Sequence, residues 1–224
     1  MLKSFLLSIL LFAHAGCATR AKPEGAKYLS RPLIIGASVS AGAGTVGPGT
    51  RLSLRYTQGS NIQIFARGGT PGAKLAAGLN ENLFSGVSSV IAVDFLFWDS
   101  TLEDPAPSFE ALGKLLSLSQ ARGIPVVLGD VPELLRNGQP SRQRLNEMIR
   151  ASCTLARHCQ VLALDQLYTK LQREGTLEIR GRRYTQQEIL PDGLHLSAPA
   201  SEHIADLIFN DLQRAAGGKE VVSN

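Results

Sequence analysis

Aromatic residues are scarce in this chain, which has 8 Phe, 4 Tyr and 1 Trp among its 224 residues. So few rings argue against a surface on which several aromatic side chains stack on sugars or nucleobases. Runs of like charge are also missing, because the net charge is only +4 and the basic residues are scattered. Nucleic-acid binders gather basic residues into patches, so we expect no nucleic-acid partner. The 44% of hydrophobic residues still suffices for a sizeable core and favours a single domain.

The first seventeen residues, MLKSFLLSILLFAHAGC, differ in character from the rest. An early Lys3, an apolar stretch over 5–13 and small residues before Cys17 are typical of an export signal, and the stretch is short for a membrane span. A cysteine directly after Ala-Gly resembles the bacterial lipoprotein signal, in which Cys17 is lipidated. His14 stands where such signals usually have an aliphatic residue. A plain secretory signal is the alternative.

Either kind of signal implies export. Lipidation of Cys17 further implies a membrane-anchored protein on the periplasmic or cell-surface side, with the outer membrane as our choice. It also leaves an even pair, Cys153 and Cys159, in an oxidising compartment, where a disulfide is expected. On one continuous helix the two would lie about 9 Å apart along the axis, beyond disulfide reach. The bond therefore predicts a helix ending near Arg157–His158. Metal binding through His158 and Cys159 is the weaker alternative, because a second ligand cluster is missing.

Composition divides the chain further. Residues 18–30 are small and polar, which is typical of a tether between an anchor and a folded domain. The residues after Ala216, GGKEVVSN, favour a frayed tail. We therefore expect a signal peptide over 1–17, a tether over 18–30, one domain over 31–216 and a flexible tail over 217–224.

Short apolar runs recur along the domain, with room for a helix between them. Continuous apolar runs are typical of strands buried on both faces, and the intervening segments have apolar positions at helical spacing. The pattern predicts an α/β fold of three layers, α/β/α, around a central five-stranded parallel sheet. The expected strands are 32–38, 61–66, 88–95, 124–131 and 160–165.

The first expected strand is followed by GASVSAGAG (36–44). Its small residues let the backbone turn sharply and hold Ser38 at the carboxyl end of the strand, where parallel sheets bind ligands and backbone N–H donors are close. A phosphate cradle is the alternative for a glycine-rich turn, but neither the dinucleotide-binding spacing nor the Gly-Lys-Ser/Thr ending is present. A turn that only packs a helix against the sheet is the remaining explanation.

A second polar segment, LPDGLHLSAPA (190–200), precedes the last expected helix. It places Asp192 three residues before His195, so that one short turn can aim the carboxylate at the imidazole. A serine hydroxyl needs such a base, since a carboxylate holds the histidine tautomer that accepts the proton. Ser38, His195 and Asp192 are therefore the candidate catalytic residues.

Together these segments resemble the SGNH or GDSL-type serine hydrolases over about residues 31 to 214. GASVS (36–40) is similar to the nucleophile block, with Ala37 where Asp is commoner, and DGLHLS (192–197) to the final block. The resemblance implies a flavodoxin-like sheet and a Ser38–His195–Asp192 triad that needs no cofactor or metal. RGGTPGAKL (67–75) resembles the glycine block. This likeness implies an oxyanion hole of the Ser38 and Gly72 backbone N–H groups, with Gly69 as second choice.

One block departs from the family pattern. Where the family has Gly-x-Asn-Asp, whose Asn amide contributes to the oxyanion hole, this chain has LFWDS (96–100) with Trp98 at the Asn position. Removing one oxyanion donor typically costs on the order of 10²–10³ in turnover. Trp98 can point its indole N–H into the site or fill an acyl pocket with its ring, and Asn80 or Asn82 can supply an amide instead. The sequence leaves these alternatives open.

The resemblance implies a serine-dependent hydrolase of carboxylic esters that works through an acyl-enzyme on a small-molecule, lipid or glycan ester. The alternative, favoured by Trp98, is a catalytically weak or inactive lipoprotein of the same fold that binds an acylated or glycan ligand in the cell envelope. A hairpin expected over 176–189 carries Arg180, Arg182 and Arg183, which can meet an anionic substrate or simply form a solvated charged face. The oligomeric state is not indicated.

Overall fold

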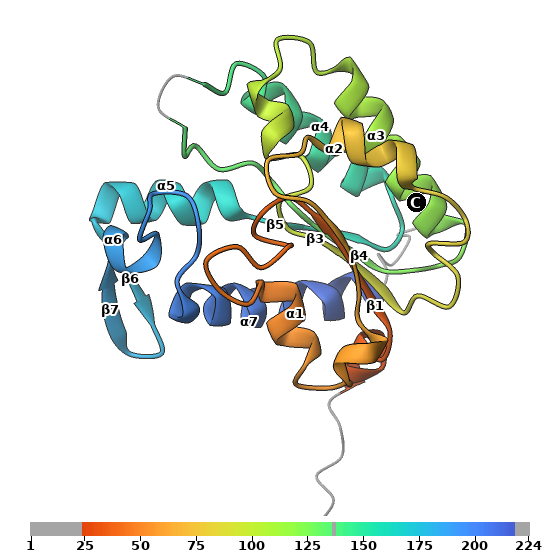
Figure 1. The fold of residues 1–224 in the computed structure, drawn as a ribbon, viewed down its shortest axis with the longest axis horizontal. Helices are drawn as coiled ribbons and strands as arrows, with labels where there is room; N and C mark the ends of the chain where they lie inside the picture. Colours follow the sequence, from red (N-terminus) through yellow and green to blue (C-terminus); the bar gives the residue numbers. More distant parts are fainter. Residues whose placement is uncertain (1–23, 136–137, 218–224) are drawn as a thin grey trace, which may run out of the picture.

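The computed structural model describes residues 24–135 and 138–217, so the expected signal peptide and Cys17 lie outside the described residues. Its middle layer is a five-stranded parallel sheet in the order β2-β1-β3-β4-β5 (Figure 1). The parallel sheet confirms the predicted fold class, and each strand lies close to its predicted segment. The strands are β1 (Pro32–Gly36), β2 (Gln63–Ala66), β3 (Ser89–Ala92), β4 (Val126–Gly129) and β5 (Cys159–Leu162).

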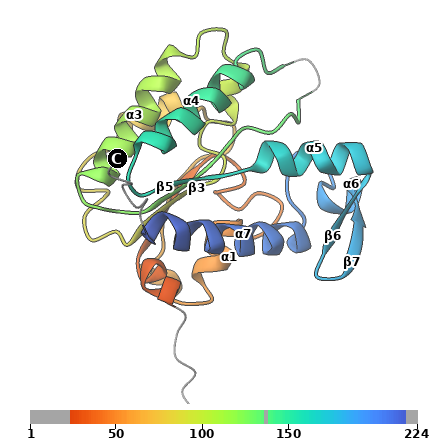
Figure 2. The same ribbon diagram turned by 180° about the vertical axis from the view of Figure 1, so that it is seen from behind.

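Helices cover both faces of the sheet, as Figures 1 and 2 show from opposite sides. One face is covered by α2 (Gly72–Leu75), α3 (Ala106–Gln120) and α4 (Arg142–Leu155), and the other by α1 (Pro48–Ser53) and α7 (Ala198–Gly217). Beyond the sheet, α5 (Leu164–Glu174) leads to the hairpin of β6 (Thr176–Ile179) and β7 (Arg182–Thr185) and to α6 (Gln186–Ile189). Within the described residues there are also four 3₁₀ helices: η1 (Glu24–Leu29), η2 (Gly59–Asn61), η3 (Ala76–Gly78) and η4 (Trp98–Thr101).

The central strands are apolar throughout because both of their faces are buried. Successive side chains of a strand point to opposite faces of the sheet. In β1, Leu33 and Ile35 therefore join the core beneath α3 and α4, whereas Ile34 joins the core beneath α1 and α7. Ile34 is in register with Ile64 of β2 and Ile91 of β3. The carboxyl ends of the parallel strands meet at one edge, where the candidate site lies.

The ends of the described chain differ in part from the expected tether and tail. Residues 24–29 form η1, in which Leu29 is fully buried, and the carbonyl of Tyr28 accepts a hydrogen bond from Ser88 Oγ. The second half of the expected tether is therefore part of the fold. At the other end α7 continues to Gly217. Within the described ranges no helix combines the length and apolar character that crossing a membrane requires.

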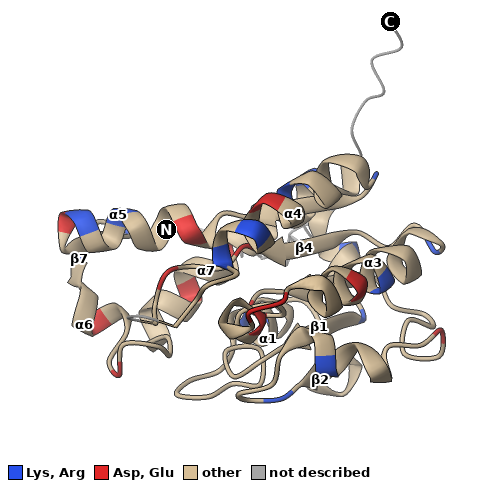
Figure 3. Cartoon of the chain, turned by 90° about the horizontal axis from the view of Figure 1, so that it is seen from above, with Lys and Arg blue, Asp and Glu red and all other residues tan. Residues whose placement is uncertain are grey.

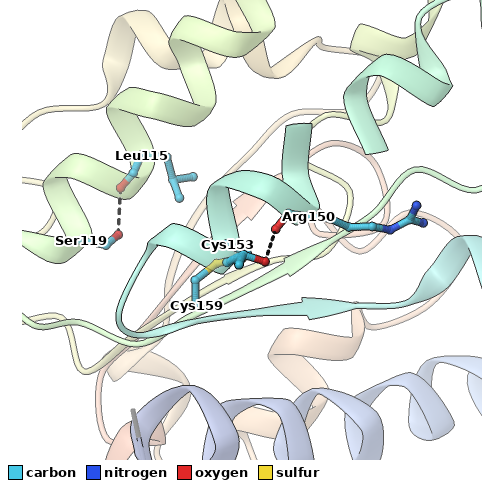
Figure 4. The surroundings of a disulfide bond; sticks show 6 residues. Leu115, Ser119, Arg150, Cys153 and Cys159 are labelled. Atoms are coloured by element: carbon cyan, nitrogen blue, oxygen red, sulfur yellow. Dashed lines mark hydrogen bonds between the residues drawn. A yellow bond between two sulfur atoms is a disulfide. The ribbon is translucent and has the colours of Figure 1, made fainter. Parts of the chain in front are cut away.

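A disulfide joins Cys153 in the last turn of α4 to Cys159, the first residue of β5 (Figure 4). The helix ends at Leu155, two residues before the predicted position, and the two Cα atoms are 5.0 Å apart. Both cysteines are buried in the core beneath α3 and α4. The bond therefore fixes the short connection between a helix and an edge strand.

We expect the double variant Cys153→Ala, Cys159→Ala to lose about 2 kcal/mol of unfolding free energy. A disulfide that closes so short a loop stabilises the fold by about this amount, because it lowers the conformational entropy of the unfolded chain. Urea unfolding followed by circular dichroism measures this loss. A reducing agent is expected to lower the stability of the parent protein to that of the variant and to leave the variant unchanged. Equal stability of the oxidised parent and the variant would contradict the prediction.

Candidate active site

Ser38 lies directly beyond the carboxyl end of β1, in a tight turn. The turn is closed by backbone hydrogen bonds from the Ala41 N–H to the Ala37 carbonyl and from the Ala43 N–H to the Ser38 carbonyl, both 2.9 Å. Ser38 is 8% exposed and lines a cavity at the edge of the sheet. A side chain on Gly36 would clash with the carboxylate of Asp94, so only glycine allows the strand to pass so close to it.

Asp94, which follows β3, holds this turn together. Its carboxylate accepts hydrogen bonds from the N–H groups of Ala37 (3.0 Å), Val39 (2.8 Å) and Ser40 (3.3 Å) and from the Ser40 hydroxyl (2.5 Å). Burial raises the pKa of Asp94, and these donors oppose that rise. The backbone N–H of Ser38 itself donates no hydrogen bond to any described residue. The turn thus presents one free N–H beside the Ser38 hydroxyl.

Asp94 is a candidate functional residue that the sequence alone did not indicate. The signal in the sequence is a single carboxylate at the end of an otherwise apolar run, SSVIAVDF (88–95). A buried acid in such a place needs several donors, and the turn after β1 supplies them.

Asp192 and His195 are brought together by one turn, as predicted from their spacing. Asp192 Oδ1 accepts the N–H groups of Leu194 (3.0 Å) and His195 (2.7 Å), and Asp192 Oδ2 lies 2.7 Å from His195 Nδ1. Gly193 between them has a φ of +80°, which favours glycine. The backbone and ring N–H groups of His195 hold the pKa of Asp192 far below its ordinary value. Because an ionised carboxylate only accepts, Nδ1 is the donor and Nε2 is left to accept a proton.

The Asp192–His195 turn lies against the turn that carries Ser38. A Cβ added to Gly44 would be 3.2 Å from the His195 Cβ, so the two turns are in contact. Leu194 and Leu196, on either side of His195, line the same cavity as Ser38. Among the hydrogen bonds of the described residues, none joins Ser38 directly to His195. Such bonds often form only when substrate is bound.

The glycine block is placed differently from the expectation. Gly72 donates its N–H to Asp99 Oδ2 at 2.5 Å, and Ala73 donates to Asp99 Oδ1 at 2.9 Å. Asp99 is fully buried and caps the start of α2, so the Gly72 N–H is engaged within the protein. Gly68 instead lies beside the nucleophile candidate: a Cβ on Gly68 would be 3.7 Å from the Ser38 Cβ. With its N–H bonded to Asp99, Gly72 offers no free donor for the expected oxyanion hole, whereas Gly68 lies beside Ser38.

Trp98, which stands at the family's Asn position, begins η4 and packs against the core beneath α3 and α4. Its ring meets that of Phe97 edge-on at a centroid distance of 5.4 Å. Phe97 lines the cavity beside Ser38, whereas Trp98 is not part of the lining. The indole Nε1 is buried and has no hydrogen-bond partner among the described residues. Asn80 is engaged in its own turn, donating to the Gly78 carbonyl and accepting from the Leu83 N–H.

The cavity beside Ser38 is small and mostly apolar, with a volume of about 30 Å³. Its polar groups include Ser38, Asp94 and Tyr168, and burial together with the nearby charge of Asp94 raises the pKa of the Tyr168 hydroxyl. In the described ranges no cluster of His, Cys, Asp and Glu side chains has the arrangement of a metal site. The apolar lining comprises Val39, Val93, Phe97, Val131, Pro132, Leu134, Leu164, Leu194, Leu196 and Ile204.

The expected hairpin also forms, and two of its three arginines, Arg180 and Arg182, are engaged within the protein. Arg180, in the turn with a φ of +52°, pairs with Asp206 at 2.7 Å and Glu202 at 3.4 Å on α7. Arg182 lies over the Tyr184 ring at 4.6 Å. The Arg180 pairs anchor the hairpin to α7, and for Arg180 and Arg182 the contacts favour a structural role over substrate binding.

No family model and no curated protein matches this chain. Among solved structures, an esterase from Pseudoalteromonas sp. is similar with a TM-score of 0.58 and 17% identity, covering 83% of this chain and 97% of its own. A lipase/acylhydrolase from Enterococcus faecalis gives 0.59 and 18%, covering 84% and 97%. A candidate SGNH hydrolase from Slackia heliotrinireducens gives 0.55 and 13%, covering 82% and 98%. The chain therefore has the fold of the SGNH-type hydrolases, as its motifs predicted.

Proposed function

We propose that this protein hydrolyses carboxylic esters through an acyl-enzyme on Ser38. The observation that carries the proposal is the pairing of Asp192 with His195 in a turn that lies against the Ser38 turn, around one cavity at the carboxyl edge of the sheet. Acyl transfer to serine needs a hydroxyl, a base and a carboxylate that orients the base.

The proposed reaction has two halves. Ser38 Oγ attacks the ester carbonyl while its proton passes to His195 Nε2, and the tetrahedral oxyanion lies against the N–H groups of Ser38 and Gly68. The alcohol leaves with the proton from His195. Water then attacks the acyl-enzyme with His195 as base, which releases the carboxylic acid and restores the Ser38 hydroxyl.

A second function is favoured by one observation. Trp98 packs into the core, so its ring does not replace the amide that the family's Asn contributes at the site. A protein of this fold that binds an acylated or glycan ligand without turning it over is therefore the alternative. Hydrolysis of para-nitrophenyl acetate and labelling by a fluorophosphonate probe separate the two, because labelling requires an activated hydroxyl. Neither turnover nor labelling in folded protein would favour the binding function.

The place of action is also a proposal. Residues 1–17 support export, and Cys17 supports lipid anchoring to a membrane on the extracytoplasmic side. The mass of the mature N-terminal peptide tests this directly, since a cut before Cys17 and an acylated cysteine are expected together.

We expect Asp192→Asn to lower kcat by up to about 10⁴, because an Asn amide no longer holds the imidazole tautomer that accepts a proton. The same variant has a pH signature. The pKa of Asp192 is lowered in the fold, so its ionised form stabilises the protein above its ordinary value of 3.8, and this contribution is lost as the pH falls below that value. Asp192→Asn should therefore have a lower Tm than the parent at pH 7 and 5, and the difference should begin to narrow at pH 3, because the pKa in the fold lies far below 3.8.

Thermal unfolding at pH 7, 5 and 3, with kcat measured at pH 7, checks both parts. Asp104→Asn is a matched control, since Asp104 is also an exposed acid that accepts a backbone N–H, from Ala106, but lies outside the site. A constant Tm difference across the pH range would contradict the assignment.

A further inference from the structure

Two spaces of very different volume lie near Ser38, a small cavity and a large groove. The apolar cavity is partly open to solvent and has a volume of about 30 Å³, while one water molecule needs roughly 10–15 Å³. Such a cavity holds a group about the size of a methyl or ethyl and excludes a longer chain. On the other side, an open groove of about 660 Å³ runs along the edge strand β2 and the glycine block, from Ile64 to Gly78.

This groove adjoins the candidate site at the glycine block. Gly68 and Gly69 line the groove, and Gly68 is also the residue that lies beside Ser38. An ester whose acyl end fills the small cavity must place its remaining part outside it, and the groove is the adjoining space that is large enough. The bulky part of the substrate is therefore the alcohol.

The charge of the groove indicates what kind of alcohol it takes. Arg67 and Lys74 line the groove, both are exposed, and neither has an ion-pair partner within the described ranges. Figure 3 shows the Lys and Arg positions in blue, spread over several elements of the fold. Other arginines are held by acids, as Arg180 is by Asp206 and Arg142 by Asp165. Unpaired cations in a groove attract an anionic ligand. Apolar lining from Phe65 and Pro71, next to exposed glycine backbone, suits the mixed apolar and hydroxyl faces of sugar rings.

We propose that the substrate is an acidic polysaccharide carrying short acyl esters such as acetyl groups, with its chain in the β2 groove and its acyl group in the cavity beside Ser38. This inference rests on the proposed ester hydrolysis. A phospholipid fits less well, because its long acyl chains do not enter the small cavity.

The first test compares acetate release from chemically O-acetylated polygalacturonate and from O-acetylated xylan, whose backbone is uncharged. The double variant Arg67→Gln, Lys74→Gln is expected to lower the ratio of acidic to neutral kcat/KM about tenfold. Lys170→Gln, Arg173→Gln removes the same charge from α5, where both residues pair with Glu174, and should keep the parent's ratio. Added salt should reduce activity on the acidic polymer more than on the neutral one.

A second test does not depend on turnover. Calorimetry with the Ser38→Ala protein is expected to show binding of unacetylated polygalacturonate oligomers, weakened by Arg67→Gln, Lys74→Gln, and weaker binding of xylo-oligosaccharides. An unchanged ratio in the groove variant, or a preference for anionic phospholipid vesicles over polygalacturonate, would overturn the proposal. Failure of fluorophosphonate labelling at Ser38 would overturn the proposed hydrolysis alone, because the binding measurement still reports on the groove.

Discussion

Ser38→Ala is expected to lower kcat/KM for para-nitrophenyl acetate at least about 10³-fold and to abolish labelling by a fluorophosphonate. Ser38 provides the only atom that bonds to the acyl group in the proposed reaction. The oxyanion donors and His195 remain in the variant, so only slow hydrolysis by water is left. The turn itself should be preserved, because its hydrogen bonds to Asp94 come from the neighbours of Ser38.

Initial rates, together with mass spectrometry of the labelled peptide, measure both effects. Two neighbouring serines serve as controls for the identity of the nucleophile. Ser40 donates its hydroxyl to Asp94, so the labelled peptide should carry the probe on Ser38 and not on Ser40. Ser197 lies near His195, and its hydroxyl has no hydrogen-bond partner among the described residues, so Ser197→Ala should retain turnover. Full activity and labelling in Ser38→Ala would reject the proposed mechanism.

The second large effect is expected at Asp94. Asp94→Ala leaves three backbone N–H groups and the Ser40 hydroxyl without their acceptor in a buried place, which should reduce the unfolding free energy by about 3 kcal/mol or more. Turnover should also fall about 10²-fold, because a shift of the turn by about 1 Å misplaces the nucleophile. Urea unfolding and ester hydrolysis measure the two effects.

Asp94→Asn keeps the prediction testable if the alanine variant does not fold. Asn has about the same volume as Asp, but one of the two Asp94 oxygens becomes an N–H₂ group that faces the donors of the turn. The variant therefore restores at most part of the hydrogen bonding. We expect a smaller loss of stability and still a clear loss of turnover. Glu110→Gln, on the exposed surface of α3, is the matched control and should change neither. Parental stability and turnover in Asp94→Asn would show that the turn does not depend on this carboxylate.

The sequence predicted those parts of the molecule that depend on local pattern. The apolar runs predicted five parallel strands because a strand buried on both faces must be apolar throughout, and β1 shows this with Ile34 and Ile35 on opposite sides. The Asp192–His195 pair was predictable for a similar reason, since three residues and a glycine suffice to close the turn. The position of Ser38 at the end of β1 followed from the same strand pattern.

Contacts between distant segments were decided only by the tertiary structure. Asp94 reaches the Ser38 turn across 57 positions of sequence, and Asp99 takes the Gly72 N–H across 27. Spacing alone gives no sign of either bond, and the second one changes which glycine can act as an oxyanion donor. Arg180 likewise forms its ion pair with Asp206 on α7, which is distant in sequence. The sequence by itself determined the sheet and the Asp192–His195 turn, because those depend on neighbours along the chain. Packing decided which polar groups are engaged and which remain free, because that depends on neighbours in space.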